Sequence, residues 1–483
     1  MKAETIKKEN QNRIINPVTL RAYDIRGEVG SQLQIEDAFY IGKAFATKVI
    51  RKTKNKKPSI AVGFDGRLSS PEIRKNLIEG ILESGAKIVA ITLGASPMLY
   101  FSVKKYNLDA GIMITGSHNP KNHNGFKMMY NKAPLFGEEI QEIGVICKNA
   151  DYENGSGSIE EIDVREEYLN QLLNSITQIN SDFLKNMRIA WDSGNGAAGE
   201  IVSKLVKKIP AKHFLINEKI DGNFPAHHPD PTVAENLVQL IDLVRENNCD
   251  FGIAFDGDGD RIGAVDGKGR IIWGDKLLTF FADDIISENK NATIIADVKA
   301  SQTFFDKVVE LGGKPVMWKT GHSFIKQKLA ETGALLAGEM SGHIFFADKN
   351  YGYDDAIYAA TRLIDYFAKN KLKASDAYDK LPNSFSTEEY RISVSEEAKI
   401  KIVADIKEKM LAEKSPQEIN EIDGVRIKET ELNGWWLLRS SNTQNAISIR
   451  AEATSEENLE EIKSKISNLI KPYGVSLVNS SAH

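Results

Sequence analysis

Apolar and polar residues along this chain follow a strand–helix–strand pattern that occurs three times. A β-rich run at Ser59–Phe64 is followed by helical spacing from Ser70, the expected N-cap, and by an apolar run at Lys87–Leu93. The same plan recurs at Met187–Ile216 and at Ala292–Trp318. In each repeat an acid ends the first strand, namely Asp65, Asp192 and Asp297. The pattern predicts three related α/β domains whose ligands gather at the carboxyl ends of strands.

The chain from about Pro382 onward has a different pattern. It shows strand-like runs, a helix over Ser395–Leu411, a turn at Asp423-Gly424 and a last helix whose capping box we assign to Thr454 and Glu457. One face of that helix carries Leu459, Ile462, Ile466 and Leu469. We interpret this tail as a separate α+β domain.

The bulk composition is that of an ordinary globular protein of several domains. The chain has 483 residues, 41% of them hydrophobic and 27% charged. A net charge of −5 argues against a general nucleic-acid binder, and no apolar run approaches the length that spans a membrane. The polar stretch before Pro17 lacks a signal-peptide core, and the two cysteines offer no disulfide framework. We therefore expect a cytoplasmic protein.

Three carboxylates lie close together in FDGDGDR, between the apolar runs Phe251–Phe255 and Ile262–Val265. These runs predict two strands joined by a tight loop that carries Asp256, Asp258 and Asp260. A calcium loop of the EF-hand type requires Gly at position 6 and Glu at position 12, where this chain has Arg261 and Gly267. An acidic turn without a ligand is the alternative. Three carboxylates this close repel one another unless a cation is present, and their oxygens suit Mg²⁺ or Ca²⁺.

A single serine is presented in ITGSHNP, Ile114–Pro120. The G-x-S-x-G elbow of many serine hydrolases is absent around Ser117, and His118 is poorly placed to act as its base. A turn serine that satisfies backbone groups is the alternative. Lys127 follows on a predicted strand, either as a solvated side chain or as a group that serves an anion or assists proton transfer. Taken with the acidic loop, Ser117 indicates phosphoryl transfer through a covalent phosphoserine.

Five motifs in a characteristic order resemble those of the alpha-D-phosphohexomutase superfamily, and most closely its bacterial phosphomannomutase/phosphoglucomutase branch. They are RAYDIRG (Arg21–Gly27), TGSHNP, DGDGDR, GEMSGH (Gly338–His343) and RSSNT (Arg439–Thr443). The resemblance covers nearly the whole chain after its N-terminal stretch. The superfamily usually has a proline two residues after the threonine of the last motif, where this chain has Asn445. That difference concerns the stiffness of the loop rather than its ligands.

The resemblance assigns roles to particular residues. The implied catalytic residues are Ser117 as phosphoryl carrier, Arg261 as its fixed charge, and Lys127 and His343 as proton-transfer groups. The implied metal site is Ser117, Asp256, Asp258 and Asp260, with one Mg²⁺ per chain. The implied substrate-binding residues are Tyr23, Arg26, Lys299, His322, Glu339, Ser341, His343, Arg439, Ser441, Asn442 and Thr443. Without the resemblance, RSSNT is equally well an ordinary hairpin loop, and GEMSGH a polar loop with a structural glycine.

The implied activity is interconversion of hexose 6-phosphate and hexose 1-phosphate, with mannose or glucose as the sugar. The phosphoserine and a hexose 1,6-bisphosphate intermediate carry the phosphoryl group, and the bisphosphate also serves as activator. The GEMSGH motif favours an enzyme that accepts both mannose and glucose phosphates. The alternative enzyme is phosphoglucosamine mutase. A phosphosugar-binding protein without turnover is the less favoured alternative. We expect a phosphosugar substrate, no nucleic acid, no membrane, and a monomer or weak homo-oligomer.

The expected fold is α/β, with three related mixed-sheet domains and a C-terminal α+β domain around a central cleft. The expected bounds are residues 1–168 with the phosphoserine loop, 169–270 with the metal loop, 271–381 with the sugar-recognition loop, and 382–483 with the phosphate-binding loop.

Overall fold

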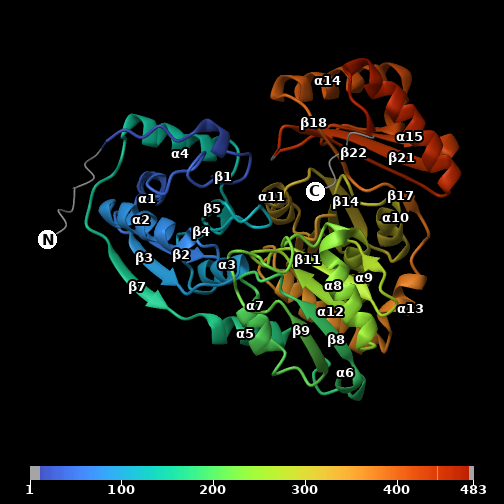
Figure 1. Ribbon diagram of the computed structural model, residues 1–483, viewed down its shortest axis with the longest axis horizontal. Coiled ribbons are helices and arrows are strands. Elements are labelled where there is room, and N and C mark those ends of the chain that lie inside the picture. The colour runs from blue at the N-terminus through green and yellow to red at the C-terminus, as the bar shows by residue number, and fades with distance from the viewer. Residues whose placement is uncertain (1–10, 443, 478–483) are drawn as a thin grey trace. The chain divides into compact units, whose positions relative to one another are not determined.

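The computed structural model describes residues 11–442 and 444–477 (Figure 1). These residues form four β-sheets and divide into two compact units, residues 1–271 with 349–372 and residues 272–348 with 373–483. We call them unit 1 and unit 2, and each holds two sheets. In the described ranges we find no helix long and apolar enough to cross a membrane. Short 3₁₀ helices lie at Pro17–Thr19, Ala234–Leu237, Pro416–Glu418, Thr430–Leu432 and Lys471–Tyr473.

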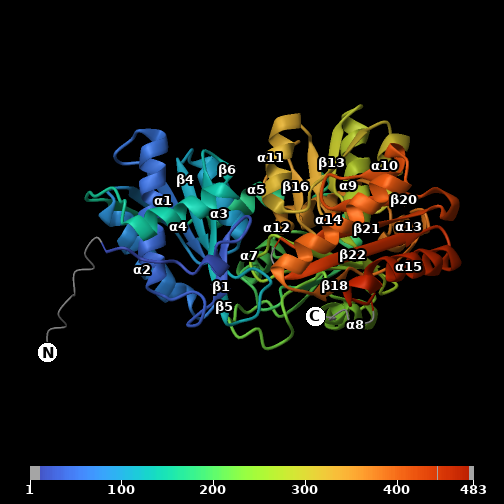
Figure 2. The same ribbon diagram turned by 90° about the horizontal axis from the view of Figure 1, so that it is seen from above.

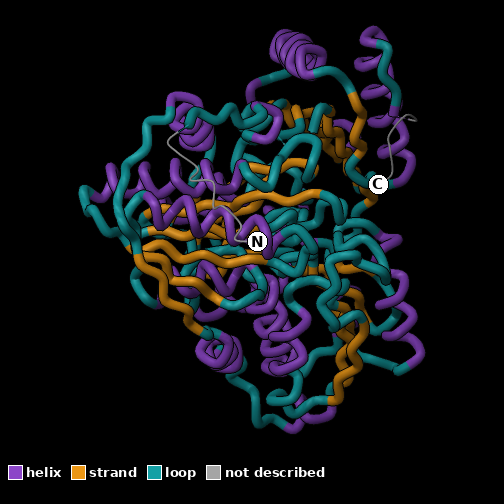
Figure 3. The backbone as a smooth tube through the Cα atoms, turned by 60° about the vertical axis from the view of Figure 1, so that its left-hand side comes forward, coloured by secondary structure: helices purple, strands orange, loops and turns teal. Residues whose placement is uncertain are grey.

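The first sheet of unit 1 has the strand order β1-β5-β4-β2-β3-β7, with β6 paired to β5. Its strands are β1 (Ile25–Glu28), β2 (Ser59–Phe64), β3 (Lys87–Ile91), β4 (Ala110–Ile114), β5 (His123–Tyr130), β6 (Ala133–Pro134) and β7 (Ser158–Ile162). Its helices are α1 (Asp37–Thr53), α2 (Ser70–Glu83), α3 (Ser96–Lys105) and α4 (Glu138–Asn149). Strands β2, β3, β4 and β7 are parallel, so β2 and β4 end at the same edge. Figure 3 shows orange strands layered between purple helices.

Helices α1 and α2 lie side by side because two glycines allow their backbones to touch (Figure 1, Figure 2). A Cβ at Gly80 would come 2.0 Å from the carbonyl oxygen of Phe39, and one at Gly42 would come 2.5 Å from that of Leu77. The predicted N-cap of α2 was wrong by one residue. Ser69 occupies the cap position without a side-chain capping bond, and the Ser70 hydroxyl donates to Asp65 Oδ1 at 2.6 Å.

The second sheet of unit 1 has the order β12-β11-β10-β8-β9. Its strands are β8 (Arg188–Asp192), β9 (Lys212–Ile216), β10 (Phe251–Phe255), β11 (Ile262–Asp266) and β12 (Ile271–Ile272). The helices of this part are α5 (Arg165–Asn174), α6 (Asp182–Asn186), α7 (Gly199–Leu205), α8 (Val238–Glu246) and α12 (Ala356–Asn370). Strands β10 and β11 pair antiparallel, with Phe255 opposite Ile262. The predicted hairpin around the three aspartates is therefore confirmed.

The first sheet of unit 2 has the order β14-β13-β15-β16. Its strands are β13 (Thr293–Asp297), β14 (Lys314–Trp318), β15 (Leu336–Gly338) and β16 (Ile344–Phe346). The helices are α9 (Gly274–Glu288), α10 (Gln302–Glu310), α11 (His322–Thr332) and α13 (Ala374–Asp379). Strands β13, β14 and β15 are parallel, and β15 turns back into antiparallel β16.

The last sheet has the order β17-β22-β21-β20-β19, with β18 paired to β22. Its strands are β17 (Phe385–Ser386), β18 (Tyr390–Ser393), β19 (Ile419–Asn420), β20 (Val425–Glu429), β21 (Gly434–Ser440) and β22 (Ala446–Ala453). Helices α14 (Glu396–Glu413) and α15 (Glu456–Ile470) pack on it. Residues of β21 alternate between two cores, since Trp436 joins the helices while Trp435 packs on Val298. The predicted cap at Thr454 was wrong: Ser455 accepts the Asn458 N–H.

Candidate active site

Ser117 lies in the loop that follows β4 in unit 1, with only 1% of its surface exposed. Its hydroxyl donates to Asp256 Oδ2 at 3.0 Å and lies 3.3 Å from His118 Nδ1. Its backbone has a φ of 48°, in the left-handed region that serine rarely adopts. Strain of this kind persists only where surrounding contacts impose it, and it concentrates at functional sites.

The acidic loop between β10 and β11 packs directly against Ser117. A Cβ at Gly257 would come 2.4 Å from the carbonyl oxygen of Ser117, so the two backbones touch at this glycine. Asp256, Asp258 and Asp260 are fully buried, and one carboxylate oxygen of each lies within 4.8 Å of the others. Two segments 139 residues apart thus present one hydroxyl and three carboxylates to a common point.

Lys127 reaches the same point from β5. Its ammonium donates to Asp258 Oδ2 at 2.7 Å and to Asp260 Oδ2 at 2.5 Å, and the side chain is 4% exposed. Burial alone would lower the pKa of Lys127, but the carboxylates of Asp258 and Asp260 raise it above its ordinary value. Lys127 is therefore protonated in this arrangement, where it can donate a proton or stabilise negative charge.

The three carboxylates differ in their ease of ionisation. Burial and the neighbouring charges of Asp258 and Asp260 raise the pKa of Asp256. Burial acts in the same direction on Asp258, but the Lys127 ammonium outweighs it, and the pKa of Asp258 falls below its ordinary value. A single lysine does not neutralise three buried acids, so the cluster favours a further positive charge.

The cluster fits a hard divalent cation on two grounds. Carboxylate oxygens are the donors that such cations prefer, and no cysteine or histidine belongs to this group of three. Asp258 Oδ1 is also buried without a hydrogen-bond partner among the described residues. Buried carboxylate oxygens without a partner are costly, and a bound cation would satisfy this one.

The other predicted residues of unit 1 lie on or beside β1 and at the end of the acidic loop. Arg26, on β1, donates to Asn119 Oδ1 at 3.0 Å and also pairs with Asp24. Tyr23 is half-buried in the bend before β1. The Arg261 N–H donates to Asp256 Oδ1 at 3.1 Å, while its guanidinium lies 4.0 Å from an Asp230 carboxylate oxygen. Arg26 thus contacts the serine loop, and Arg261 lies at the end of the acidic loop.

In unit 2, the predicted substrate-binding residues gather at the carboxyl ends of three parallel strands. Lys299 follows β13, His322 begins α11 after β14, and the GEMSGH motif joins β15 to β16. Parallel strands end at one edge of their sheet, which explains why segments spread over more than forty residues of sequence meet there. The rings of His322 and His343 are stacked, with centroids 5.4 Å apart.

The GEMSGH loop is held by its own acid. Glu339 Oε1 accepts the Gly321 N–H at 2.6 Å, and Gly342 turns the chain with a φ of 86°. Ser341, at the tip of this loop, is half-buried. Nearby, burial raises the pKa of Asp297 to about 6, with Lys299 opposing the shift and Glu339 adding to it.

The RSSNT motif lies at the turn between β21 and β22. Arg439, on β21, donates from Nε to Asp423 Oδ2 at 2.9 Å, and the same oxygen accepts the Thr320 N–H at 3.0 Å. The Asn442 side chain donates to the carbonyl of Thr320 at 3.3 Å. Ser441 is half-buried, and its N–H donates to Ala446 O. Thr443 lies outside the described residues.

Lys299 is linked to the last sheet through Glu389. The Lys299 ammonium lies 3.4 Å from Glu389 Oε2, an oxygen that Arg391 contacts at 3.1 Å, and the Ser448 hydroxyl donates to Glu389 Oε1. Burial would raise the pKa of Glu389, but Lys299 and Arg391 hold it well below its usual range. Glu389 is therefore a negative charge that contacts Lys299, one of the predicted substrate-binding residues.

Several site residues escaped the sequence analysis. They are Arg67, which bonds to the Ser117 loop, Ser96, which donates to Asp258, and the counter-ions Asp423 and Glu389. Local signals existed for Arg67, which follows the strand-end pair Asp65-Gly66 that opens the first repeat, and for Asp423, which lies in the predicted turn Asp423-Gly424. Ser96 and Glu389 have no such signal and are recognised by their partners.

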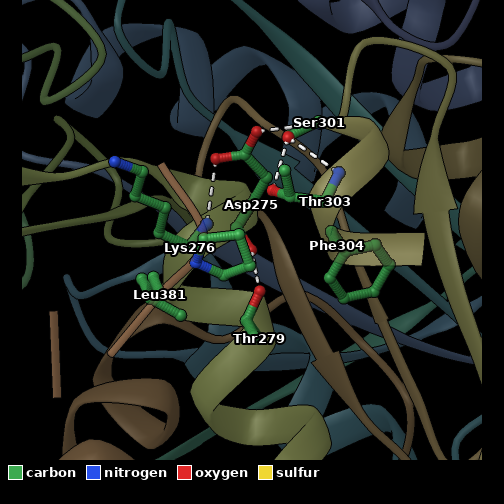
Figure 4. A pocket seen from close by; sticks show the side chains of 8 residues that line it. Asp275, Lys276, Thr279, Ser301, Thr303, Phe304 and Leu381 are labelled. Atoms are coloured by element: carbon green, nitrogen blue, oxygen red, sulfur yellow. Dashed lines mark hydrogen bonds between the residues drawn. The ribbon is translucent and has the colours of Figure 1, made fainter. Parts of the chain in front are cut away.

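A small pocket elsewhere in unit 2 is not a substrate site. It lies between α9, α10 and the segment at Leu381, and Figure 4 shows the carboxylate of Asp275 bonded to the backbone of Lys276 and Ser301. Its volume is about 10 Å³. That is room for about one water molecule, so a hexose phosphate does not fit.

Comparison with known proteins covers all four parts of the chain. Residues 18–154, 166–269 and 273–385 match the families described as phosphoglucomutase/phosphomannomutase alpha/beta/alpha domains I, II and III, and residues 389–469 match the C-terminal domain. The fold is therefore α/β with four domains.

Individual relatives extend over almost the full length. A phosphomannomutase/phosphoglucomutase of Pseudomonas aeruginosa is 41% identical over 457 residues, covering 95% of this chain and 96% of its own. A phosphoglucomutase of Neisseria gonorrhoeae is 38% identical and covers 93% and 96%. The crystal structure of a phosphoglucomutase/phosphomannomutase family protein from Burkholderia thailandensis superposes with a TM-score of 0.86 at 37% identity, covering 95% and 98%. The chain therefore belongs to the phosphoglucomutase/phosphomannomutase family of the alpha-D-phosphohexomutase superfamily.

Proposed function

We propose that this protein interconverts hexose 6-phosphate and hexose 1-phosphate through a phosphoserine at Ser117. Its membership in the family makes it a hexose-phosphate mutase, which is an isomerase. The observation that supports the proposed mechanism is the position of the Ser117 hydroxyl, which is buried and lies 3.0 Å from a carboxylate oxygen of Asp256. The backbone of Ser117 is held in the left-handed region. Ordinary turn serines do not face three buried acids.

Asp256, Asp258 and Asp260 are our proposed ligands for one Mg²⁺, with an oxygen of the phosphorylated Ser117 completing the set. The bound cation would offset the negative charge on the phosphoryl oxygens. Lys127, protonated because of Asp258 and Asp260, adds a second positive charge, and Arg261 adds a third beside the same loop. Positioning and charge stabilisation of this kind supply most of the catalysis in phosphoryl transfer.

The proposed reaction consists of two balanced transfers. In the first, a hydroxyl of the sugar phosphate attacks phosphorus, its bond to phosphorus forms, and the bond between Ser117 Oγ and phosphorus breaks. The product is a hexose 1,6-bisphosphate. In the second transfer, Ser117 Oγ attacks the phosphorus of its other phosphoryl group, and the bond between that phosphorus and the sugar oxygen breaks, which leaves the isomeric hexose phosphate. We assign His343 as the acceptor of the proton of the attacking hydroxyl, and Lys127 as the donor of a proton to Ser117 Oγ as its bond to phosphorus breaks. Free hexose 1,6-bisphosphate would rephosphorylate a dephosphorylated enzyme and so act as activator.

The residues of unit 2 are our proposed substrate contacts. Arg439, Ser441, Asn442 and Thr443 would bind the phosphate that does not react, and Lys299 and His322 would approach it from the third sheet. Glu339 and Ser341 offer acceptors and a donor to sugar hydroxyls, and Tyr23 and Arg26 of unit 1 complete the set. Arg–phosphate contacts can be bidentate, which gives orientation as well as affinity.

Mannose and glucose phosphates are the proposed substrates, because one relative is named for both activities and another for the glucose activity. The deciding experiment measures kcat/KM on mannose 1-phosphate, glucose 1-phosphate and glucosamine 1-phosphate, with catalytic hexose 1,6-bisphosphate and Mg²⁺. We expect turnover of the first two. Preference for the hexosamine would identify a phosphoglucosamine mutase, and absence of all turnover with retained ligand binding would identify a binding protein.

Further properties belong to the same proposal. The four domains would have bounds near residues 168, 270 and 381, as the sequence patterns predict. Both cysteines, Cys147 and Cys249, are buried thiols, which suits the reducing cytoplasm. We expect a monomer or weak homo-oligomer that does not bind nucleic acid, and sedimentation with and without DNA would test both expectations.

A further inference from the structure

The loop that carries Ser117 is irregular from Gly116 to Asn122, yet its carbonyl groups converge on one side chain. The Arg67 guanidinium donates from Nη2 to the carbonyl of Ser117 at 2.7 Å and to that of Asn119 at 2.6 Å. From Nη1 it donates to Pro120 O at 2.6 Å and His123 O at 2.9 Å. Arg67 itself is 1% exposed. One buried cation thus satisfies three backbone acceptors of the loop and one at the first residue of β5.

Asp65 fixes the other edge of this arrangement. Its Oδ2 lies 3.3 Å from Arg67 Nε and accepts the Gly116 N–H at 3.2 Å, while its Oδ1 accepts the Arg67 N–H at 3.0 Å. The loop is therefore held by both its donor and its acceptor groups. A Cβ at Gly116 would come 2.4 Å from Arg67 Cζ, so the loop backbone lies directly against the guanidinium.

An aromatic ring also lies against the guanidinium. Phe224, from the segment after β9, places its ring centroid 5.1 Å from Arg67 Cζ. Burial lowers the pKa of Arg67, with the Asp65 carboxylate opposing the shift. Burying a charge without compensating contacts costs free energy. The carbonyl groups of the loop and the Asp65 carboxylate supply that compensation for Arg67.

We infer that Arg67 is a positioning residue for phosphoryl transfer, which acts through the backbone of Ser117. This inference rests on the proposed function of Ser117. By holding the Ser117 and Asn119 carbonyls, Arg67 keeps Ser117 in its left-handed conformation, with Oγ 3.0 Å from Asp256. Lysine cannot replace it fully, because an ammonium has three donors on one atom whereas guanidinium spreads five over a rigid plane.

The test compares Arg67→Gln and Arg67→Lys with the wild-type enzyme, each at matched folded fraction. We expect kcat to fall about a hundredfold in Arg67→Gln, the size that a misplacement of about 1 Å produces, and to fall less in Arg67→Lys. The KM for hexose phosphate should stay within about threefold, because uniform substrate binding is retained. The second readout is the rate at which 1,6-bisphosphate phosphorylates Ser117, followed by intact-mass spectrometry, and it should slow in parallel with kcat.

A matched control is Arg188→Gln. Arg188 also donates to a backbone carbonyl, that of Asn247 at 2.8 and 2.5 Å, and lies 5.0 Å from the ring centroid of Phe214, but away from Ser117. It should lower the melting temperature at most and leave both rates per folded molecule unchanged. Unchanged rates in folded Arg67→Gln would overturn the inference.

Two further variants keep the inference testable. If Arg67→Gln does not fold, Gly116→Ala decides, because it disturbs the same contact while Arg67 stays; a large kcat loss supports the inference and wild-type kcat overturns it. Ser117→Ala is measured beside them. Turnover in Ser117→Ala would refute the phosphoserine itself, whereas an inactive Ser117→Ala with a fully active Arg67→Gln would refute only the role of Arg67.

Discussion

The proposed reacting groups of unit 1 and the proposed substrate-binding groups of unit 2 are held in different ways. In unit 1, Ser117, Lys127 and the three aspartates bond directly to one another and are almost completely buried. In unit 2, Arg439 is paired with Asp423 and Lys299 with Glu389, while Ser341, Ser441 and Asn442 are half-buried. One group is a single bonded cluster, and the other is a set of separate pairs.

The difference follows from what each group would do. Phosphoryl transfer requires charges fixed where negative charge develops, because reorganisation during the reaction adds to the barrier. Binding a sugar phosphate in two orientations instead requires cations whose carboxylate partners can be exchanged for phosphate. We therefore expect substitutions in unit 1 to lower kcat and substitutions in unit 2 to act chiefly on kcat/KM, and the following predictions test that contrast in order of size.

Ser117→Ala should abolish mutase turnover and leave the fold intact, because the only atom lost is the proposed phosphoryl acceptor. The measurement is a coupled assay together with mass spectrometry of the Ser117 peptide, which should carry phosphate in the wild type. Ser203→Ala removes a helix hydroxyl that bonds to Gly199 O and is the control. Near-normal turnover in Ser117→Ala would disprove the covalent mechanism.

Asp258→Asn should lower kcat by roughly a hundredfold or more, since it removes both a carboxylate ligand and the partner of Lys127. A chelator should inactivate the wild type, and Mg²⁺ should restore it. Calorimetric titration with Mg²⁺ checks binding apart from turnover. Asp242→Asn, an exposed acid on α8, should have no effect. Full activity of the wild type in metal-free buffer would rule out the proposed metal site.

Arg439→Ala should lower kcat/KM by about tenfold to a hundredfold in both reaction directions, because a lost charge-assisted contact costs about 1.5–3 kcal/mol. Steady-state kinetics with 1-phosphate and 6-phosphate substrates measures this, and Ser117 should still accept phosphate. Arg270→Ala, which breaks a pair with Asp266 in unit 1, is the control. A loss in one direction only would contradict a shared phosphate pocket.

Asp355→Asn should change the pH dependence of stability without entering the reaction. Burial raises the pKa of Asp355 to about 7, although the Tyr358 N–H and the Tyr168 hydroxyl favour its ionised form. The folded state therefore binds more protons than the unfolded one between the ordinary value of 3.8 and about 7. Stability conferred by the protonated acid is lost as pH rises through that window, at about 1.4 kcal/mol per pKa unit.

The asparagine keeps an N-cap for α12 without a charge. Melting temperatures at pH 5 and pH 8 should therefore differ less in Asp355→Asn than in the wild type. An equal difference in both proteins would show that Asp355 is ionised throughout, and Asp242→Asn again serves as the control.

Local patterns were sufficient for much of the fold. Apolar runs placed β2, β10 and β11 to within one residue, because strand periodicity and the acids and glycines between strands are properties of neighbouring residues. Helix caps were less predictable. Ser70 and Thr454 fitted the pattern, yet the helices begin after Ser69 and Ser455, and the Ser70 hydroxyl bonds to Asp65 instead.

The sequence by itself determined the residue types of the site, since Ser117 in a polar loop and three aspartates spaced by glycines already indicate phosphoryl transfer. Only the tertiary structure decided how they are held. Arg67 acts on carbonyl groups, which every residue possesses and no side-chain pattern reveals. Asp423 and Glu389 become counter-ions because strands distant in sequence end beside them. Such contacts depend on the packing of whole sheets, and local sequence carries little record of it.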